Sequence, residues 1–162
     1  MKEFHTLKPI YNNKSKILIL GSFPSVMSRE NNFYYANPTN RFWKIFENLF
    51  NTKLSSKEDK ISFLLNNNIA LYDVIASCSI HKSSDSSITN IVPNDISIII
   101  NNSNVKYIFV NGKKALELYN KYLLKELKIE GIYLPSTSSA NATYSLEKLI
   151  KEYSIILDYL KK

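Results

Sequence analysis

The sequence predicts an α/β protein of three layers, α/β/α, in which helices cover both faces of a central, mainly four-stranded parallel sheet. Short, continuous apolar runs bounded by turn residues alternate along the chain with segments whose apolar residues recur at the helical period. Strands that are separated by helices pair in parallel, which gives a layered α/β fold. With 162 residues the chain is long enough for one proper core, so we expect a single domain over residues 1–162.

Four apolar runs are typical of buried strands. They are residues 16–21 (KILILG), 68–75 (NIALYDVI), 106–112 (KYIFVNG) and 131–135 (GIYLP). Ligands bind where the carboxyl ends of parallel strands open into loops. The polar segments 21–25 (GSFPS), 72–77 (YDVIAS) and 134–141 (LPSTSSAN) therefore predict one shared rim.

Helical stripes of apolar residues lie between and after these strands. The first follows Thr39 and contains Phe42, Ile45, Phe46 and Leu49, which with Trp43 are expected to pack in the core. The second follows a capping-box pattern from Ser55 to Glu58 and contains Ile61, Leu64 and Leu65. A third contains Ala115, Leu118, Tyr119, Tyr122 and Leu123, and the last fits the helical period from Leu146 to Leu160. Residues 76–92 are expected to form the longest polar connection, and their length makes them a candidate functional loop.

Composition narrows the classes of function. The formal net charge of +7 favours a polyanionic partner such as nucleic acid. Cys78 is the one cysteine, so neither an internal disulfide nor a four-cysteine metal site is available, and no metal or cofactor is expected. His5 and His81 stand in no ligand spacing and are expected to be solvated surface residues. No signal-peptide pattern and no apolar run of the length of a membrane span is found, so we expect a cytoplasmic protein.

Two common enzyme signatures are missing. The segment 21–25 lacks the glycines of a phosphate loop or a dinucleotide-binding fingerprint, which disfavours nucleotide hydrolysis. No G-x-S-x-G elbow argues for a serine hydrolase. The most unusual segment is residues 33–46 (FYYANPTNRFWKIF). It contains six aromatic residues, two asparagines and one of the two arginines of the chain, all close to a turn. Core packing explains only some of these side chains.

Six motifs occur in order along roughly residues 15 to 160, namely GSFPSVMSRE, FYYANPTNRFW, LYDVIASC, NDI, NGKKA and LPSTSSAN. Through these motifs the chain resembles the DNA-deoxyinosine (hypoxanthine-DNA) glycosylase family of the uracil-DNA glycosylase superfamily. The resemblance implies a monofunctional, metal-free, monomeric enzyme that extrudes a deaminated base from double-stranded DNA, chiefly hypoxanthine, and hydrolyses its N-glycosidic bond. An abasic site for base-excision repair would remain.

The same resemblance assigns roles to residues of this chain. It places Tyr35 where the flipped base is stacked, Phe23 where relatives keep a water-activating asparagine, and Asn40 as the catalytic amide on a helix start. Phe23 is thus expected among the base-binding residues. Asp73, at the end of the second strand, would accept the N1–H of hypoxanthine. Two structural roles are the alternatives to these functional ones. Asn40 could instead bond to the local backbone near the helix start, and Asp73 could cap the end of its strand for the loop that follows.

Contacts with DNA are expected from the polar rim. The resemblance implies them for Ser22, Ser25, Arg41, Ser136, Thr137, Ser138 and Asn141. Small hydroxyls and backbone amides allow close approach to phosphates in the minor groove. The chain departs from the family pattern at Asn37, Ser138 and Ser139, where histidine, histidine and proline are common. With Ser138, imidazole help to the leaving group is absent. The departures at Asn37 and Ser139 bear on the rate more than on the identity of the enzyme. The alternative for residues 136–141 is a plain polar turn.

Other interpretations stay open at this point. Uracil or G/U mismatch excision is the alternative within the superfamily. A non-catalytic module that binds damaged DNA would keep the pocket without turnover, and an enzyme of free nucleosides would show no salt-dependent affinity for DNA. Lys113, Lys114, Lys148 and Lys151 are candidates for attracting phosphate, although a solvated face suits most of them.

Overall fold

A computed structural model of the chain describes residues 1–80 and 88–162. Its elements are, in chain order, β1 (Lys2–Phe4), β2 (Ile17–Gly21), α1 (Val26–Asn31), α2 (Phe42–Leu49), α3 (Lys57–Asn66), β3 (Ile69–Asp73), β4 (Ile75–Ile80), β5 (Ile88–Pro93), α4 (Ser97–Asn101), β6 (Tyr107–Asn111), α5 (Lys113–Tyr122), α6 (Leu124–Leu127), β7 (Gly131–Leu134), α7 (Leu146–Tyr153) and α8 (Ile155–Leu160). No helix in these two ranges is both long and apolar enough to cross a membrane.

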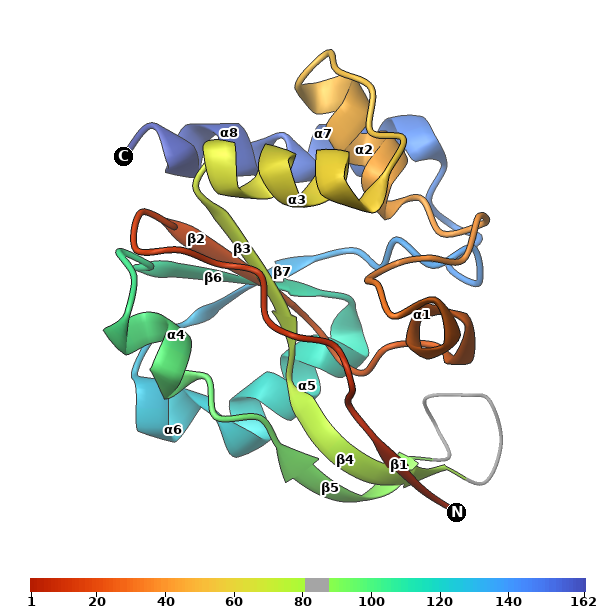
Figure 1. Cartoon of the computed structure of the whole chain (residues 1–162), viewed down its shortest axis with the longest axis vertical. Coiled ribbons are helices and arrows are strands. Elements are labelled where there is room, and N and C mark those ends of the chain that lie inside the picture. The colour runs from red at the N-terminus through yellow and green to blue at the C-terminus, as the bar shows by residue number, and fades with distance from the viewer. Residues whose placement is uncertain (81–87) are drawn as a thin grey trace.

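The predicted parallel sheet is confirmed. Its four strands run in the order β3-β2-β6-β7, and each neighbouring pair is parallel. Helices α2, α3, α7 and α8 cover one face, and α4, α5 and α6 lie on the other (Figure 1). The carboxyl ends of the strands consequently meet at one edge of the sheet.

Each face of the sheet has its own core, which follows from the alternation of side chains along a strand. In β2, Ile17 and Ile19 belong to the cluster under α2, α3 and α7, whereas Leu18 and Leu20 belong to the cluster under α4 and α5. All five residues of β2 are buried, as expected for the inner strand of a doubly covered sheet. Phe42, Trp43 and Phe46 are buried in the first cluster, as predicted.

A second sheet was not predicted. β1, β4 and β5 form an antiparallel sheet in the order β1-β4-β5, with Glu3 opposite Cys78. The prediction of one long polar connection over residues 76–92 is therefore wrong for 76–80 and 88–92, which lie in paired strands. The remainder of that segment, 81–87, lies outside the described residues.

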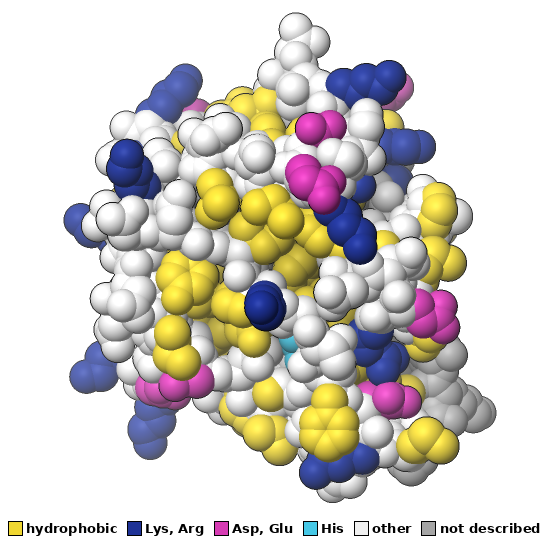
Figure 2. Space-filling view, viewed as in Figure 1, with side chains coloured by type: hydrophobic (Ala, Val, Ile, Leu, Met, Phe, Trp, Pro, Cys, Tyr) yellow, Lys and Arg dark blue, Asp and Glu magenta, His cyan; other side chains and the backbone are white. Residues whose placement is uncertain are grey.

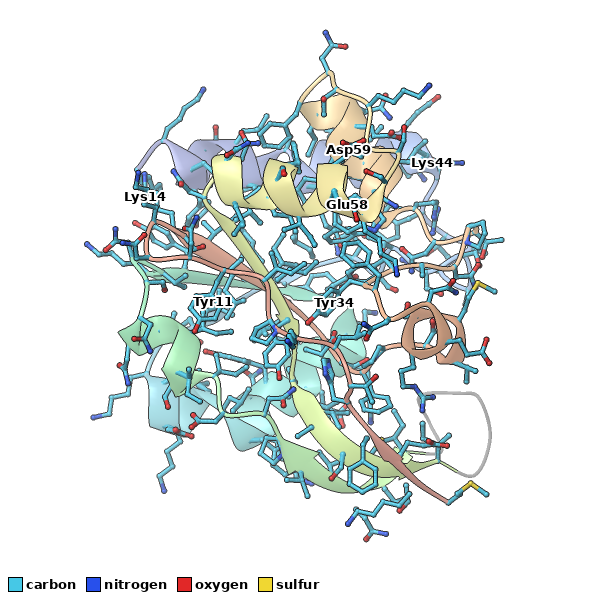
Figure 3. All side chains as sticks on the ribbon, viewed as in Figure 1. Tyr11, Lys14, Tyr34, Lys44, Glu58 and Asp59 are labelled. Atoms are coloured by element: carbon cyan, nitrogen blue, oxygen red, sulfur yellow. The ribbon has the colours of Figure 1, made fainter. Side chains whose placement is uncertain are left out.

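Three predicted helix details also need correction. The capping box of α3 joins Ser56 to Asp59, one residue later than predicted, and in it Ser56 Oγ accepts from the Asp59 N–H. Figure 3 labels Asp59 at the start of this helix. The predicted last helix is divided at Ser154 into α7 and α8. Asn40 is not in the first turn of a helix, because α2 begins at Phe42 with Arg41 as its N-cap residue.

Candidate active site

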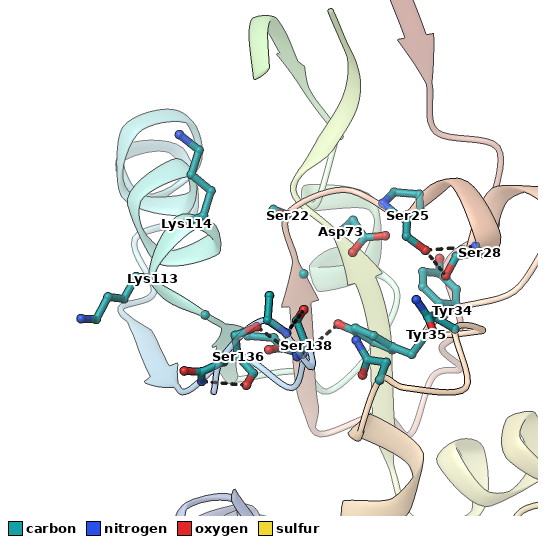
Figure 4. A pocket seen from close by; sticks show the side chains of 18 of the residues that line it. Ser22, Ser25, Ser28, Tyr34, Tyr35, Asp73, Lys113, Lys114, Ser136 and Ser138 are labelled. Atoms are coloured by element: carbon teal, nitrogen blue, oxygen red, sulfur yellow. Dashed lines mark hydrogen bonds between the residues drawn. The ribbon is translucent and has the colours of Figure 1, made fainter. Parts of the chain in front are cut away.

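A cavity of about 780 Å³ opens at the carboxyl edge of the parallel sheet. Every strand of that sheet contributes to its wall: Gly21 ends β2, Asp73 ends β3, Asn111 ends β6, and Ser136 follows β7. Figure 4 shows Tyr34, Tyr35 and Asp73 on one side of this cavity and Lys113 and Lys114 on the other. The predicted rim is thus one site, of a volume that is ordinary for a ligand pocket.

Tyr35 supplies an aromatic wall of the cavity. Its ring stacks on Phe42 with centroids 4.1 Å apart and planes 12° from parallel. The backbone at Tyr35 has a φ of 51°, a left-handed conformation that is strained for a bulky side chain. Burial, and secondarily the charge of Asp73, raises the pKa of Tyr35, so the ring stays neutral. A planar, neutral surface backed by a second ring suits the stacking of a base.

Asn40 lies on the cavity wall just before α2. Its side-chain oxygen accepts from the Phe42 N–H at 3.0 Å and from the Thr137 hydroxyl at 2.8 Å. Within residues 1–80 and 88–162 its Nδ2 makes no hydrogen bond. The predicted alternative, a local backbone contact, therefore coexists with a free pair of N–H donors.

Asn111 extends this network. Its Nδ2 donates to the Tyr35 and Thr137 hydroxyls, each at 3.2 Å, and its Oδ1 accepts from the Thr137 N–H at 3.1 Å. Thr137 is 1% exposed and does not line the cavity, so its place is beneath the site. One chain of hydrogen bonds thus links Tyr35, Asn111, Thr137 and Asn40 and fixes their relative positions.

Asp73 lies deep in the site. Its side chain is 5% exposed, and its Oδ2 accepts from His5 Nε2 at 2.8 Å. A Cβ placed on Gly21 would lie 2.5 Å from Asp73 Oδ1, so glycine is required for the carboxylate to stand there. The prediction that His5 is a solvated surface residue is wrong, because its side chain is 2% exposed.

Arg41 holds the loop of residues 136–144. Its guanidinium donates to the backbone oxygens of Thr137 (3.4 Å), Ser138 (2.8 Å) and Asn141 (3.1 Å), and also to that of Tyr144. These carbonyl groups occupy most of its donors. The structure therefore places Arg41 as a brace of the loop, and its predicted contact with DNA stays a prediction.

The remaining predicted site residues occupy different places. Ser22, Ser25, Ser136, Ser138 and Asn141 line the cavity, and Ser25 also caps α1 through the Ser28 N–H. Phe23 does not line the cavity. Its ring meets the edge of His5 and lies under the Arg29 guanidinium, 5.1 Å from the ring centre. The contact of Phe23 with the base stays a prediction.

Several of the cavity residues were not among those predicted from the sequence. Asn111 was only part of the NGKKA resemblance, and its place at a strand end could have identified it. Ser28, which is 2% exposed and accepts from the Ala36 N–H at 3.1 Å, carries no sequence signal of its own. Among the described residues no cluster of three or more His, Cys, Asp or Glu side chains could hold a metal ion.

A second, more apolar groove of about 410 Å³ lies between the N-terminal segment and α3. It is lined by Thr6, Leu7, Lys8, Pro9, Ile10, Tyr11, Asn32, Phe33, Tyr34, Ile61 and Leu65. Apolar side chains gather in the middle of the face seen in Figure 2.

Comparison with known proteins gives consistent matches. The family model described as the uracil DNA glycosylase superfamily matches residues 9–161. A hypoxanthine DNA glycosylase of Methanosarcina acetivorans is 35% identical over 139 residues, which are 84% of this chain and 87% of the relative. One of Methanosarcina barkeri is 31% identical over 136 residues, or 82% of this chain and 85% of the relative. A solution NMR structure from Methanosarcina acetivorans, whose name places it among the uracil DNA glycosylases, has a TM-score of 0.84 and 32% identity, with both chains fully covered.

Proposed function

The chain belongs to the uracil DNA glycosylase superfamily, and from this premise we propose that it hydrolyses the N-glycosidic bond of deaminated bases in DNA, chiefly hypoxanthine. The product would be an abasic site that base-excision repair then processes. Double-stranded DNA that contains the deaminated base is the proposed substrate. The names of two relatives support hypoxanthine as the base, and the geometry of the cavity supports the chemistry.

One observation carries the proposal. An aromatic wall, a buried carboxylate and an amide with free N–H donors face the same cavity, in Tyr35, Asp73 and Asn40. A glycosylase extrudes the nucleotide from the duplex and reads it in a pocket by stacking and by hydrogen bonds to its edge. Tyr35 would stack the base, and Asp73 would accept the N1–H of hypoxanthine.

Asn40 would act on the departing base. Cleavage of the bond to C1′ develops negative charge on the base, and fixed donors that are aimed at this charge lower the barrier. The Asn40 oxygen already accepts two hydrogen bonds, so its Nδ2 is the atom left to meet the base. The amide does this without a change in protonation. Water is the proposed nucleophile, and no imine with a lysine is required.

The mouth of the cavity would hold the DNA backbone. Lys113 and Lys114 stand at the first turn of α5 and line the cavity. Ser136, Ser138 and Asn141 line the same cavity from the loop held by Arg41, and Ser136 lies beside Gly112, the residue before Lys113. Small polar groups and ammonium groups together are suited to phosphate contacts. Ser22 and Ser25 would contact the strand from the β2 side.

The test is alkali cleavage of an end-labelled duplex with a single deoxyinosine or deoxyuridine. We expect the native protein to act strongly on deoxyinosine and weakly on deoxyuridine, and Asn40→Ala and Asp73→Ala to lose the deoxyinosine activity. Cleavage of deoxyuridine alone would move the function to uracil excision. Binding of the deoxyinosine duplex without an abasic product would instead indicate a damage-binding module.

A further inference from the structure

His5 is a buried ionisable residue at the edge of the site that the proposed reaction does not use. Its ring is enclosed by Phe23, Tyr34 and Tyr72, at centroid distances of 6.2, 6.3 and 4.9 Å. It reaches Asp73 from the N-terminal segment, 68 residues away in the sequence. The same segment is held by the hydrogen bond from the Tyr34 hydroxyl to the Lys8 backbone oxygen at 2.7 Å. The Tyr34 side chain is labelled in Figure 3.

We propose that His5 is a positioning residue that sets base specificity. By donating from Nε2 to Asp73 Oδ2 it keeps this carboxylate an acceptor only, so that the cavity takes hypoxanthine and rejects adenine. The proposal rests on the function proposed above. It concerns the discrimination between a damaged base and the normal base from which deamination produces it.

The ring environment determines which nitrogen carries the hydrogen. His5 Nδ1 is buried and has no hydrogen-bond partner among the described residues. A buried donor without an acceptor is costly, whereas an unused acceptor is tolerated more readily. The geometry therefore favours a ring with its hydrogen on Nε2, where the carboxylate accepts it.

The chemistry of the two bases makes that bond decisive. Hypoxanthine presents N1–H as a donor, and adenine presents N1 as an acceptor. Asp73 Oδ1, beside Gly21, is the oxygen left for the base. An ionised carboxylate accepts from hypoxanthine and repels the lone pair of adenine N1. A carboxyl group that had gained a proton could donate to adenine instead.

No other side chain in the described part of the chain takes the place of His5. The titratable groups that face Asp73 are Tyr34, Tyr35 and Tyr72, and burial followed by the Asp73 charge raises the pKa of each. They stay neutral at ordinary pH. The nearby Arg29 donates to Glu3 at 2.9 Å and lies over Phe23. His5 is thus the one described side chain that is hydrogen-bonded to the Asp73 carboxylate.

The test compares the release of hypoxanthine with that of unsubstituted purine, whose N1 is an acceptor, from otherwise identical duplexes. His5→Phe and His5→Leu remove the donor, with and without a ring, and His5→Gln keeps an N–H donor. Glu3→Ala is the matched control, because it loosens the same N-terminal segment without touching Asp73. The readout is the ratio of kcat/KM for hypoxanthine to kcat/KM for purine, at neutral and at alkaline pH.

In both donor-free variants we expect this preference to fall about tenfold or more, since an unpaired buried carboxylate favours its neutral form. Raising the pH should restore it. His5→Gln and Glu3→Ala should keep the native preference. If the donor-free variants release both bases more slowly in the same proportion, or leave the preference unchanged, the inference is wrong. If the native protein releases no hypoxanthine, the function proposed above fails instead.

Discussion

The hydroxyl of Thr137 donates a hydrogen bond of 2.8 Å to the side-chain oxygen of Asn40. The Phe42 backbone N–H donates to the same oxygen at 3.0 Å. A backbone N–H can only donate, so the accepting atom must be oxygen, and the orientation of the amide is determined. With its oxygen engaged twice, Asn40 faces the cavity as a donor.

The first prediction concerns that donor. Asn40→Asp keeps the shape and the oxygen but loses the NH₂ group, so it should be as impaired as Asn40→Ala, by about 10²–10³-fold in single-turnover release of hypoxanthine. Asn48→Asp, on the exposed side of α2, is the control and should be unaffected. An aspartate at residue 40 that retained most of the activity would show that the oxygen is the working atom.

Gly21→Ala tests the close approach of Asp73 and Tyr35. The added Cβ would lie 2.5 Å from Asp73 Oδ1 and 2.9 Å from the Tyr35 hydroxyl, so the carboxylate has to move. We expect kcat/KM for deoxyinosine to fall at least about tenfold, because a misplaced acceptor loses its hydrogen bond to the base. Gly131→Ala, whose Cβ would meet the Tyr119 ring at 3.1 Å, should lower stability and leave the folded enzyme active.

Arg41→Lys tests the brace of the 136–144 loop. A lysine ammonium cannot match the planar fork that contacts the carbonyl groups of Thr137, Ser138 and Asn141. The free energy of unfolding should fall by about 1–3 kcal/mol. Hydrogen exchange of the loop amides should become faster, whereas Lys44→Ala, which removes an exposed side chain of α2, should change neither. An unchanged exchange rate in Arg41→Lys would mean that the loop is ordered without the brace.

Lys113 and Lys114 are predicted to contact phosphates. Replacing both by glutamine should reduce the salt dependence of DNA binding, with the slope of log K against log[salt] falling by about 0.9 for each phosphate that is no longer neutralised. Lys121, at the opposite end of α5, supplies the matched control. Lys121→Gln should leave the slope unchanged. If it lowers the slope by half as much as the double replacement or more, the effect comes from net charge and not from direct binding.

Alkaline pH should destabilise the fold through its buried tyrosines. Burial, with a smaller effect from Glu130, raises the pKa of Tyr119 from 10.0 to about 12. The folded protein keeps this proton up to about pH 12, whereas the unfolded chain loses it above the ordinary tyrosine pKa of 10.0, so the contribution to stability is complete below pH 10.0 and lost as the pH rises to about 12. Urea unfolding at intervals from about pH 8 upward measures this. Tyr119→Phe should reduce the decline, and Tyr122→Phe should not.

The sheet and the rim could be predicted because they rest on strong local signals. Continuous apolar runs, such as the one that ends at Gly21, identified the strands, and parallel pairing brought their polar ends together. The position of Asp73 at the end of β3 followed from the same pattern. These features need only the periodicity of the sequence and the rule that parallel strands share an edge.

The remainder depends on contacts between distant residues. The pairing of His5 with Asp73 requires β1 to lie beside β4, and three residues of mixed polarity give little sign of a strand. The serines of β4 suggested an exposed polar connection, whereas in the structure Ser77 is only 7% exposed. The N-terminus of α3 was displaced by one residue because Ser55 to Glu58 and Ser56 to Asp59 satisfy the same capping pattern.

The network that joins Tyr35, Asn111, Thr137 and Asn40 has a consequence for biosynthesis. Its members come from segments that are synthesised far apart in time, and Thr137 comes last. A chain in which the loop of residues 136–144 has not yet been made lacks the Thr137 hydroxyl, one of the two donors that fix the Asn40 oxygen. The proposed release of the base would therefore require that the segments around residues 35, 40, 111 and 137 have all been synthesised and have folded together.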